Sequence, residues 1–488
     1  MPKLSADSVR TIRNVETPRY DRSRLTTGIV HFGVGNFHRA HQAMYIDRLM
    51  NEGVAHDWAI CGVGVMPIDE KMRDILANQD YLYTLVLKHA DGQLEPRIIG
   101  SIHEYLYAPD DPEAVLKKLS LPSTRIVSLT VTEGGYNFDR VSGEFDLDNK
   151  SVERDLYSKV PQGMFGLIVE SLRRRRNSGI PPFTVMSCDN IRGNGDVARR
   201  SVLAFARAKN AELATWIEEW VSFPNTMVDR ITPATTDADR DMVLAKFGIN
   251  DGWPVVCEPF AQWVVEDKFK GVRPPLQDVG VQFTPDVEPY ELMKLRLLNA
   301  THQGMAYFGY LAGYRYVHEA ASDPSIVRLL TRYMDEEATP TLAPVPGVDL
   351  SVYKRKLIER FENPEIKDTL ARLATDPSDR ITQWLLPVIR ENLATNRPIH
   401  LSVAIVASWA RYAEGIDERG DQIDVVDPLR DVLGPVARAQ SNNLRAFIDV
   451  AQVFGSLSEN PRFVAEFESS LISLLERGSL KALQDILA

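Results

Sequence analysis

Hydrophobic and polar positions follow two different patterns along the chain. In the first part, short apolar runs rich in Val, Ile, Thr and Phe end in glycine or polar residues, which is typical of buried strands. Four such runs cover residues 28–35, 57–65, 124–135 and 182–190. Helical patterns separate them, as in residues 112–119 and 164–176. Apolar strands alternating with helices indicate a mostly parallel sheet covered on both faces.

The pattern changes near residue 289, where helical periodicity takes over. The stretches that follow it are residues 290–310, 326–334, 351–361, 399–413 and 463–487. A chain of 488 residues is too long for one ordinary core. We therefore predict the α/β class: a domain with a mostly parallel sheet over residues 1–286, then a mostly α-helical domain over residues 287–488.

Composition and charge narrow the possible partners. With 44% hydrophobic and 25% charged residues, the chain has the composition of a globular protein. Its net charge of -11 argues against a nucleic-acid partner, which would need a basic face. The basic run Arg173 to Arg176 precedes Gly179, and we interpret it as the solvated end of a helix that the glycine stops.

The cysteines and the apolar runs bear on location. Cys61, Cys188 and Cys257 lie in apolar surroundings and cannot pair off evenly, which suggests a reducing compartment. The first twenty residues lack the apolar core of a signal peptide. No run approaches the ~18 apolar residues that a membrane span needs. We expect a cytoplasmic protein with no membrane partner.

A glycine turn follows the first predicted strand, in the sequence Gly33-Val34-Gly35-Asn36-Phe37-His38-Arg39. In open parallel sheets, ligands bind beyond the carboxyl ends of the strands. Glycines at this point let backbone N–H groups approach a pyrophosphate at a helix N-terminus, as in Rossmann-like domains. His38 occupies the place of the usual third glycine, so the motif alone is weak. The candidate cofactor-binding residues are Gly33, Gly35, Asn36, Phe37 and Arg39, the last as a direct phosphate contact.

Polar residues also follow the other predicted strands. Asp69, beyond the second strand, could bind a ribose hydroxyl and so favour NAD over NADP, or it could cap the helix over residues 70–77; both can hold. Glu133 and Asn190 follow the third and fourth strands, either in the same cleft or as caps of their loops. His38 and His41 have no Cys or carboxylate at ligand spacing, so we expect no metal.

The stretch "KLRLLNATH", residues 294–302, carries three polar residues on a leucine-rich helix. At about 100° per residue, Lys294 and His302 lie about 80° apart, with Asn299 about 140° from Lys294. A buried amine of lowered pKa could serve as a base, an amide could donate to an oxyanion, and an imidazole could orient a hydroxyl. A structural hydrogen-bond network would have the same spacing.

Seven stretches carry a family resemblance over nearly the whole chain. They are "GIVHFGVGNFHRAHQA", "AICGVGV", "IVSLTVTEGGY", "FTVMSCDN", "FPNTMVDRITP", "WPVVCEPFAQWVVED" and "KLRLLNATH", with the K-x4-N-x2-H core of the last the most specific. With them the chain resembles the polyol-specific long-chain dehydrogenases, the mannitol 2-dehydrogenase family. Two departures from the family pattern are Ala300-Thr301, where many members have Gly-Ser, and Ile68, where some relatives carry an acid.

The resemblance implies a role for each matching residue. Lys294 matches the general base, Glu291 an acid that relays the proton outward, and His302 the residue that positions the substrate hydroxyl. Asn190 and Asn299 match an oxyanion hole, and Asp69 matches the position that selects NAD. Further active-site or substrate positions match Glu133, Asp229 and Arg372; with Arg380, Arg372 could form a cationic pocket.

The expected activity is the reversible, metal-independent, NAD-dependent oxidation of an acyclic polyol. The preferred reaction is the oxidation of D-mannitol to D-fructose. Alternatives within the class are D-arabinitol, D-sorbitol or a fructuronate/mannonate pair, which would use the cationic pocket. A non-catalytic NAD-binding sensor is the alternative from another class. The resemblance leans towards a monomer.

Overall fold

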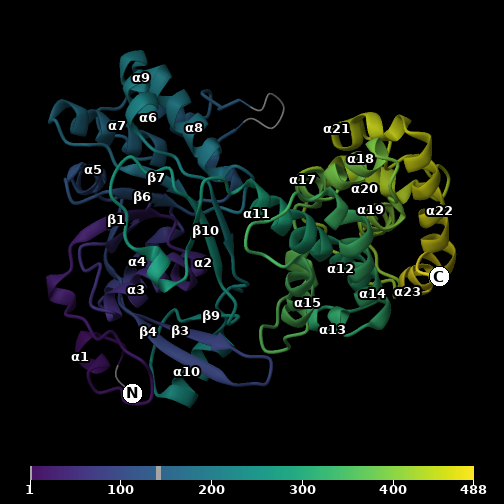
Figure 1. Cartoon of the computed structure of the whole chain (residues 1–488), viewed down its shortest axis with the longest axis horizontal. Helices are drawn as coiled ribbons and strands as arrows, with labels where there is room; N and C mark the ends of the chain where they lie inside the picture. Colours follow the sequence, from purple (N-terminus) through teal and green to yellow (C-terminus); the bar gives the residue numbers. More distant parts are fainter. Residues whose placement is uncertain (1–2, 139–143) are drawn as a thin grey trace. The chain divides into compact units, whose positions relative to one another are not determined.

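The computed structural model describes residues 3–138 and 144–488 (Figure 1). The chain divides into two compact units, Met1–Val287 and Glu288–Ala488. We describe each unit by itself.

The first unit is built on a parallel sheet of five strands in the order β5-β2-β1-β6-β7. The strands are β1 (Thr27–Phe32), β2 (Ala59–Gly64), β5 (Ile102–Tyr107), β6 (Ile126–Leu129) and β7 (Thr184–Ser187). Every residue of β1, β2, β6 and β7 is buried, as expected for strands covered on both faces. The predicted parallel sheet is confirmed, with β5 as an additional edge strand.

Two separate apolar cores pack on the two faces of this sheet. Val30 and Phe32 of β1 face one core, whereas Ile29 of the same strand faces the other, because successive side chains of a strand point to opposite sides. The helices of the first core are α5 (Pro112–Ser120), α6 (Lys150–Tyr157), α7 (Met164–Asn177), α8 (Asn194–Lys209) and α9 (Ala211–Trp220). Those of the second are α2 (Asn36–Ala40), α3 (Gln42–Asn51) and α4 (Asp69–Ala77). The other helices of the unit are α1 (Ala6–Val9) and α10 (Asp237–Phe247).

Two small three-stranded sheets complete the first unit, and the sequence pattern did not predict them. One has the order β4-β3-β9 and the other β11-β10-β8. Their strands are β3 (Tyr83–Lys88), β4 (Leu94–Ile99), β9 (Val255–Cys257), β8 (Thr226–Asp229), β10 (Gln262–Glu266) and β11 (Gln282–Thr284). β9 and β11 have only three residues each, which is too short for a period to show.

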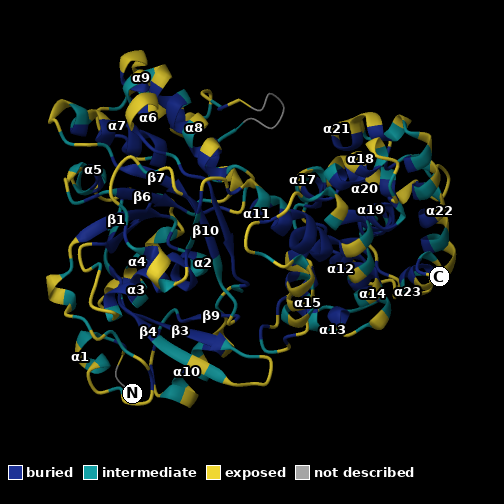
Figure 2. Ribbon diagram, in the orientation of Figure 1, coloured by how far each residue is buried: buried dark blue, intermediate teal, exposed yellow. Residues whose placement is uncertain are grey.

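The second unit is helical, which confirms the predicted α/β-then-helical class. Its middle helices, α12 (Ala300–Leu311) and α19 (His400–Tyr412), are almost entirely buried (Figure 2). The segments before and after α12 are α11 (Glu288–Met293), η4 (Lys294–Asn299), α13 (Val317–Ala321), α14 (Pro324–Arg332), η5 (Tyr333–Ala338) and α15 (Leu350–Phe361). The others are α16 (Leu370–Leu373), α17 (Pro377–Trp384), α18 (Leu386–Ala394), α20 (Arg430–Arg438), α21 (Ala451–Phe454), α22 (Pro461–Arg477) and α23 (Ser479–Ile486). Within the described parts of the chain, no helix has both the length and the apolar character to cross a membrane.

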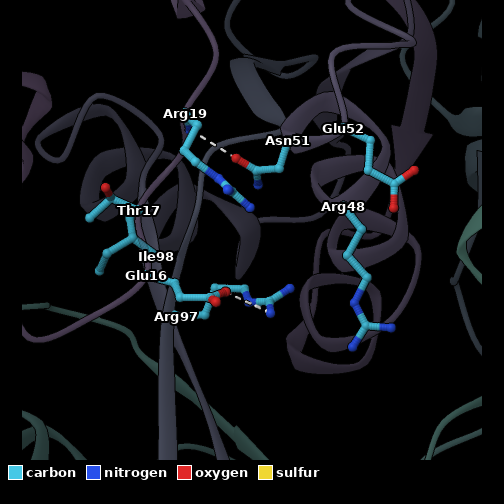
Figure 3. Close-up of a pocket in the computed structure, with 8 residues that line it drawn as sticks. All are labelled: Glu16, Thr17, Arg19, Arg48, Asn51, Glu52, Arg97 and Ile98. Carbon is cyan, nitrogen blue, oxygen red and sulfur yellow. Dashed lines mark hydrogen bonds and ion pairs between the residues drawn. The ribbon is translucent and has the colours of Figure 1, made fainter.

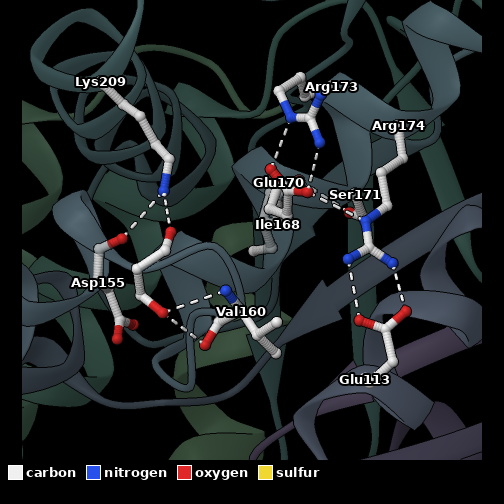
Figure 4. A network of polar contacts seen from close by, with 10 residues as sticks. Glu113, Asp155, Val160, Ile168, Glu170, Ser171, Arg173, Arg174 and Lys209 are labelled. Atoms are coloured by element: carbon white, nitrogen blue, oxygen red, sulfur yellow. Dashed lines mark hydrogen bonds and ion pairs between the residues drawn. The ribbon is translucent and has the colours of Figure 1, made fainter.

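The basic run Arg173 to Arg176 ends α7, and Gly179 follows it with φ +68, as predicted. The interpretation of this run as solvated is wrong for Arg175, which is 2% exposed. Its guanidinium donates to three backbone carbonyl oxygens, those of Leu119, Leu121 and Pro181. Two neighbouring arginines of the run pair with carboxylates (Figure 4). The run is therefore part of the packing between α7 and the end of α5.

Candidate active site

The glycine turn after β1 needs its first glycine for steric reasons. Gly33 has φ +86, and a Cβ there would lie 2.2 Å from the carbonyl oxygen of Thr130 at the end of β6. Gly35 is different, because a Cβ there would meet nothing closer than 3.9 Å. The first glycine thus lets the turn pass the neighbouring strand, and the second keeps its outer side open, as approach to a pyrophosphate requires.

Asn36 and Arg39 hold the turn in place through protein contacts. Asn36 Nδ2 donates to the carbonyl oxygen of Pro233 and to Thr235 Oγ1, both at 2.9 Å, and Asn36 Oδ1 accepts a hydrogen bond from Arg39 at 2.7 Å. Arg39 also donates to the Trp253 carbonyl oxygen and is fully buried, which lowers its pKa to about 10. These contacts favour a supporting role for Arg39, and its predicted direct contact with phosphate stays a prediction.

His38, at the place of the missing third glycine, packs flat against His31 of β1. The two ring centroids are 3.4 Å apart and the planes differ by 14°. The third glycine of the usual motif allows close packing between helix and strand, whereas here the imidazole of His38 fills the space against β1. Burial, above all, lowers the pKa of His38 well below its usual value, so the ring is neutral. Phe37 stacks on His41 with centroids 4.9 Å apart.

No metal site is visible in residues 3–138 and 144–488, where no group of three or more His, Cys, Asp or Glu side chains could hold an ion.

Asp69 closes the loop that follows β2. Its Oδ2 accepts hydrogen bonds from the backbone N–H groups of Val65 and Met66, both at 2.9 Å. Helix α4 begins at Asp69 itself, so the predicted N-cap of a helix over residues 70–77 is wrong by one residue: Asp69 lies in the first turn and reaches back to the loop. Both bonds use one carboxylate oxygen. The predicted preference for NAD stays a prediction.

Asp189, at the end of β7, anchors the loop that follows β6. Its carboxylate accepts hydrogen bonds from the N–H groups of Val131 and Thr132, at 3.1 and 2.8 Å, and from the Tyr136 hydroxyl at 2.7 Å. Thr132 has φ +64, which is strained for a β-branched residue. The strained residue directly precedes Glu133, which is exposed at the start of the 3₁₀ helix η2 (Glu133–Tyr136).

The other site residues predicted in this unit also lie at strand ends. Asn190 is exposed directly after Asp189, and Asp229 is the buried last residue of β8. Sequence reasoning did not identify Asp189 as the anchor of the neighbouring loop, because that role depends on the pairing of β6 with β7.

The stretch that holds Lys294 is a π-helix, η4, which continues into α12. The Ala300 N–H donates to the carbonyl oxygen of Leu295, five residues back, where an α-helix would use the fourth. The predicted angles between Lys294, Asn299 and His302 assumed α-helical spacing and are wrong for this wider turn. π-helical turns occur frequently at functional sites.

Two polar atoms of this stretch are buried without a partner. Lys294, Asn299 and His302 are 7%, 3% and 9% exposed. Asn299 Nδ2 and His302 Nε2 make no hydrogen bond within the described residues. A buried polar group without a partner costs about 1–3 kcal/mol, and a ligand bound here would supply both partners.

Cationic side chains surround His302. Burial is the largest cause that lowers the pKa of His302 well below its usual value, and Arg372, Arg360, Arg380 and Lys294 lower it further. The imidazole is therefore neutral, with one nitrogen that donates and one that accepts. Sequence reasoning missed Arg360, because its place near His302 depends on how α15 packs; Phe361, the next residue, lies 4.9 Å from the imidazole between ring centroids.

The two arginines that were predicted as a cationic pocket lie on neighbouring short helices. Arg372 on α16 makes two hydrogen bonds to the Asp368 carboxylate, and Arg380 on α17 donates to the carbonyl oxygen of Leu373 at 2.9 Å. Glu291 is buried in α11, directly before η4. The structure thus brings Lys294, Asn299 and His302 together with Glu291 and the two arginines in the second unit.

A cavity of about 480 Å³ lies elsewhere, wholly in the first unit (Figure 3). Its lining combines opposite charges: Arg97 pairs with Glu16 at 2.7 Å, and Arg19, Arg48 and Glu52 also line it. It contains none of the predicted site residues, so it is not the candidate site.

Comparisons with known proteins identify the family of the chain. Residues 27–278 match the model of the mannitol dehydrogenase Rossmann domain, and residues 286–475 match that of the mannitol dehydrogenase C-terminal domain. A mannitol 2-dehydrogenase of Aspergillus fumigatus is 45% identical over 477 residues, which are 96% of this chain and 95% of the relative.

Two solved structures are similar over the full length. A Pseudomonas fluorescens mannitol 2-dehydrogenase, in ternary complex with NAD and D-mannitol, matches with a TM-score of 0.92 and 45% identity, covering 100% of this chain and 99% of that one. A substrate-free D-sorbitol dehydrogenase matches with a TM-score of 0.91 and 37% identity, covering 98% of this chain and 100% of that one. On sequence and on structure, the chain belongs to the mannitol dehydrogenase family.

Proposed function

We propose that this protein catalyses the reversible NAD-dependent oxidation of a secondary alcohol of an acyclic polyol, with D-mannitol and D-fructose as the preferred pair. The observation that carries the proposal is the buried group of Lys294, Asn299 and His302, in which an amide nitrogen and an imidazole nitrogen have no partner among the described residues. A polyol offers adjacent hydroxyl groups that would satisfy both. The complex of the Pseudomonas fluorescens relative with NAD and D-mannitol supports the same pair of ligands.

The first unit fits the proposed cofactor. A dinucleotide needs a glycine turn, a helix start and a partner for its ribose. Gly35 leaves the outer side of the turn open, contacts of Asn36 and Phe37 hold the helix start in place, and Asp69 provides a carboxylate for the ribose. When bound, NAD supplies the acceptor for the hydride. We propose that Arg39 supports this site by holding Asn36.

Lys294 is the proposed base. Its Nζ takes the proton of the substrate hydroxyl, and the buried carboxyl group of Glu291, one helical turn before it, passes the proton outward. General-base catalysis of this kind contributes about 10²–10⁴-fold to a rate. The proposal needs no metal, because an amine and two amides provide the charge stabilisation.

The amide groups of Asn190 and Asn299 are proposed to donate to the substrate oxygen as it gains negative charge. His302 is neutral, and its lowered pKa makes it a weak base, so Nε2 can orient the hydroxyl without competing with Lys294 for the proton. Other residues proposed to line the substrate or proton path are Glu133, Asp229, Arg372 and Arg380.

Two specific observations favour alternative substrates. The similarity to a D-sorbitol dehydrogenase extends the candidates to D-sorbitol, with D-arabinitol as a shorter polyol of the same class. The arginines around His302 would suit the carboxylate of a hexonate such as D-mannonate, the product of fructuronate reduction.

Initial rates of NADH or NADPH formation with D-mannitol, D-arabinitol, D-sorbitol and D-mannonate test the proposal. We expect NAD-linked turnover of D-mannitol far above that of the others. A strong preference for D-mannonate would assign the arginines to substrate binding and replace the polyol. NAD binding with no turnover of any of them would reject an enzyme of this class and favour the sensor.

We also propose that the protein works as a cytoplasmic monomer without a nucleic-acid or membrane partner. The net charge of -11 supports the absence of a nucleic-acid partner, and the family resemblance supports the monomer. Sedimentation at micromolar protein concentration tests the proposed monomer, and a dimer would contradict it.

A further inference from the structure

One backbone carbonyl oxygen in η4 loses its usual partner. In an α-helix the N–H of Ala300 would donate to the carbonyl oxygen of Arg296, four residues back. In this structure it donates instead to Leu295, five residues back. The change from π-helical to α-helical spacing therefore leaves the Arg296 carbonyl oxygen without its α-helical donor, in a segment that is buried throughout.

A tyrosine from another segment supplies the missing donor. Tyr333 Oη donates to the Arg296 carbonyl oxygen at 3.1 Å, and Tyr333 is 0% exposed. Burial, followed by the charge of Glu337, raises the pKa of Tyr333 above its usual value, so the hydroxyl keeps its proton at every pH at which the protein would work. Tyr333 is the first residue of η5, a second π-helix.

A second hydroxyl supports the next turn. Thr301 Oγ1 donates to the carbonyl oxygens of Leu297 and Leu298 at 2.6 and 2.8 Å. On the other side, the Arg296 guanidinium donates to the Thr341 carbonyl oxygen at 2.8 Å and pairs with a carboxylate of α18. Side chains therefore hold the π-helical segment at consecutive residues.

We propose that Tyr333 is a positioning residue for the reaction: its hydroxyl holds Lys294 in register with Asn299 and His302 by satisfying the Arg296 carbonyl oxygen. This inference rests on the proposed function for its catalytic consequence, although not for its structural part. Without the hydroxyl, the Ala300 N–H can satisfy the same oxygen only if the turn tightens to α-helical spacing. Tightening rotates Lys294 relative to Asn299 and His302, and a displacement of about 1 Å can cost about 10²-fold in rate.

The first experiment compares Tyr333→Phe with wild type and with Tyr314→Phe. Tyr314 is a matched control in the same unit, because its hydroxyl bonds to Asp323 and does not contact η4. For Tyr333→Phe we expect kcat for the preferred polyol to fall about tenfold to 10²-fold, the KM for NAD to stay unchanged, and the apparent pKa of the base in the pH profile to shift. Tyr314→Phe should change none of these quantities.

Thr301 provides a second pair of variants if Tyr333→Phe does not fold. Thr301→Val keeps the shape of the side chain and removes its hydroxyl, whereas Thr301→Ser keeps the hydroxyl. We expect a lower kcat for the valine variant and recovery in the serine variant. Equal rates in the two variants would contradict the role of side-chain hydroxyls in holding the turn.

Hydrogen exchange of the peptide over residues 293–301 separates this inference from the proposed function. We expect faster exchange in Tyr333→Phe than in wild type, whatever substrate the enzyme uses. Unchanged exchange together with unchanged kcat and pH profile would overturn the inference. If the wild-type protein oxidises no polyol, faster exchange would still support the structural role while the proposed function fails, and unchanged exchange would reject both.

Discussion

The turn over residues 33–41 and the helix over residues 294–302 are both short polar stretches in apolar surroundings, but their asparagine amides are used in opposite ways. In the turn, Asn36 and Arg39 make side-chain hydrogen bonds to the protein. In the helix, Asn299 and His302 each keep a buried nitrogen without a partner in the described structure. The first stretch therefore offers a ligand its backbone, and the second offers side chains.

Two buried histidines show that an unpaired nitrogen is not sufficient evidence of function. His38 and His302 both have unpaired nitrogens and lowered pKa values. His38, however, is stacked on His31 within the core, whereas His302 lies among four cationic side chains. The neighbouring groups, more than the unpaired atom, distinguish a packed ring from a candidate binding group.

The largest effect should come from Lys294→Ala. Loss of the general base should lower kcat by about 10²–10⁴-fold, while the Kd for NAD stays unchanged, because the turn over residues 33–41 is intact. Steady-state rates and a titration with NAD measure the two quantities. As a control, Lys354→Ala removes a lysine that already pairs with Asp335 and should leave kcat unchanged. Turnover of Lys294→Ala near the wild-type level would remove Lys294 from the mechanism.

A pair of amide substitutions sharpens the comparison directly. Asn299→Ala should raise the barrier by about 2.7–4 kcal/mol, as for loss of an oxyanion donor, with little change in the free energy of unfolding. Asn36→Ala should do the reverse: it leaves Arg39 without one partner, lowers the free energy of unfolding by about 1–3 kcal/mol and raises the KM for NAD. Urea unfolding and steady-state kinetics of both variants would show whether each substitution lowers mainly the activity or mainly the stability. If both substitutions had the same effects on activity and stability, the two amides would not differ in their use.

Acid should destabilise the first unit through buried imidazoles such as that of His31 in β1. Burial lowers the pKa of His31 to about 3 from 6.5, so between these values the unfolded chain binds a proton that the folded chain does not. The free energy of unfolding therefore falls as the pH falls, by about 2 kcal/mol between pH 6.5 and 5 from this residue. Urea unfolding at several pH values should show a shallower decline for His31→Gln. A decline as steep as in wild type would show that His31 is not responsible.

The smallest effect concerns cofactor choice. Asp69→Asn keeps an acceptor for the N–H groups of Val65 and Met66 and removes the charge. Removal of one charge near a 2′-phosphate should weaken the preference for NAD over NADP by about 1 kcal/mol. The ratio of kcat/KM for the two cofactors measures it, and Asp69→Ala, which also loses the loop contacts, separates charge from structure. An unchanged ratio in both variants would assign selectivity to other residues.

The sequence was sufficient to predict what depends on local pattern. β1, β2, β6 and β7 were predicted because a strand buried on both faces is a continuous apolar run. β5 was missed, because its exposure alternates irregularly at the edge of the sheet. β4 was missed as well, because it contains Pro96 and is half-buried. It therefore shows neither a continuous apolar run nor a regular alternation of apolar and polar residues.

The parts of the site that could not be predicted depend on distant contacts. The sequence of residues 294–302 is compatible with both α-helical and π-helical spacing. The hydroxyl that supports the π-helical spacing comes from a later segment, where Tyr333 donates to the carbonyl oxygen of Arg296. The hydrogen bond from Arg39 to the carbonyl oxygen of Trp253, more than two hundred residues away, could likewise not be predicted from the sequence. Sequence thus identified the groups, and the tertiary structure determined how they are used.

The three cysteines make it possible to measure the opening of the first unit by thiol labelling. All lie in the first unit, buried, and burial raises their pKa values, to about 11 for Cys257. A thiol reagent needs an accessible thiolate, so it should react only when that unit opens. The rate of labelling would then report the opening of the first unit alone, in the intact, untagged protein, because that unit holds all three cysteines.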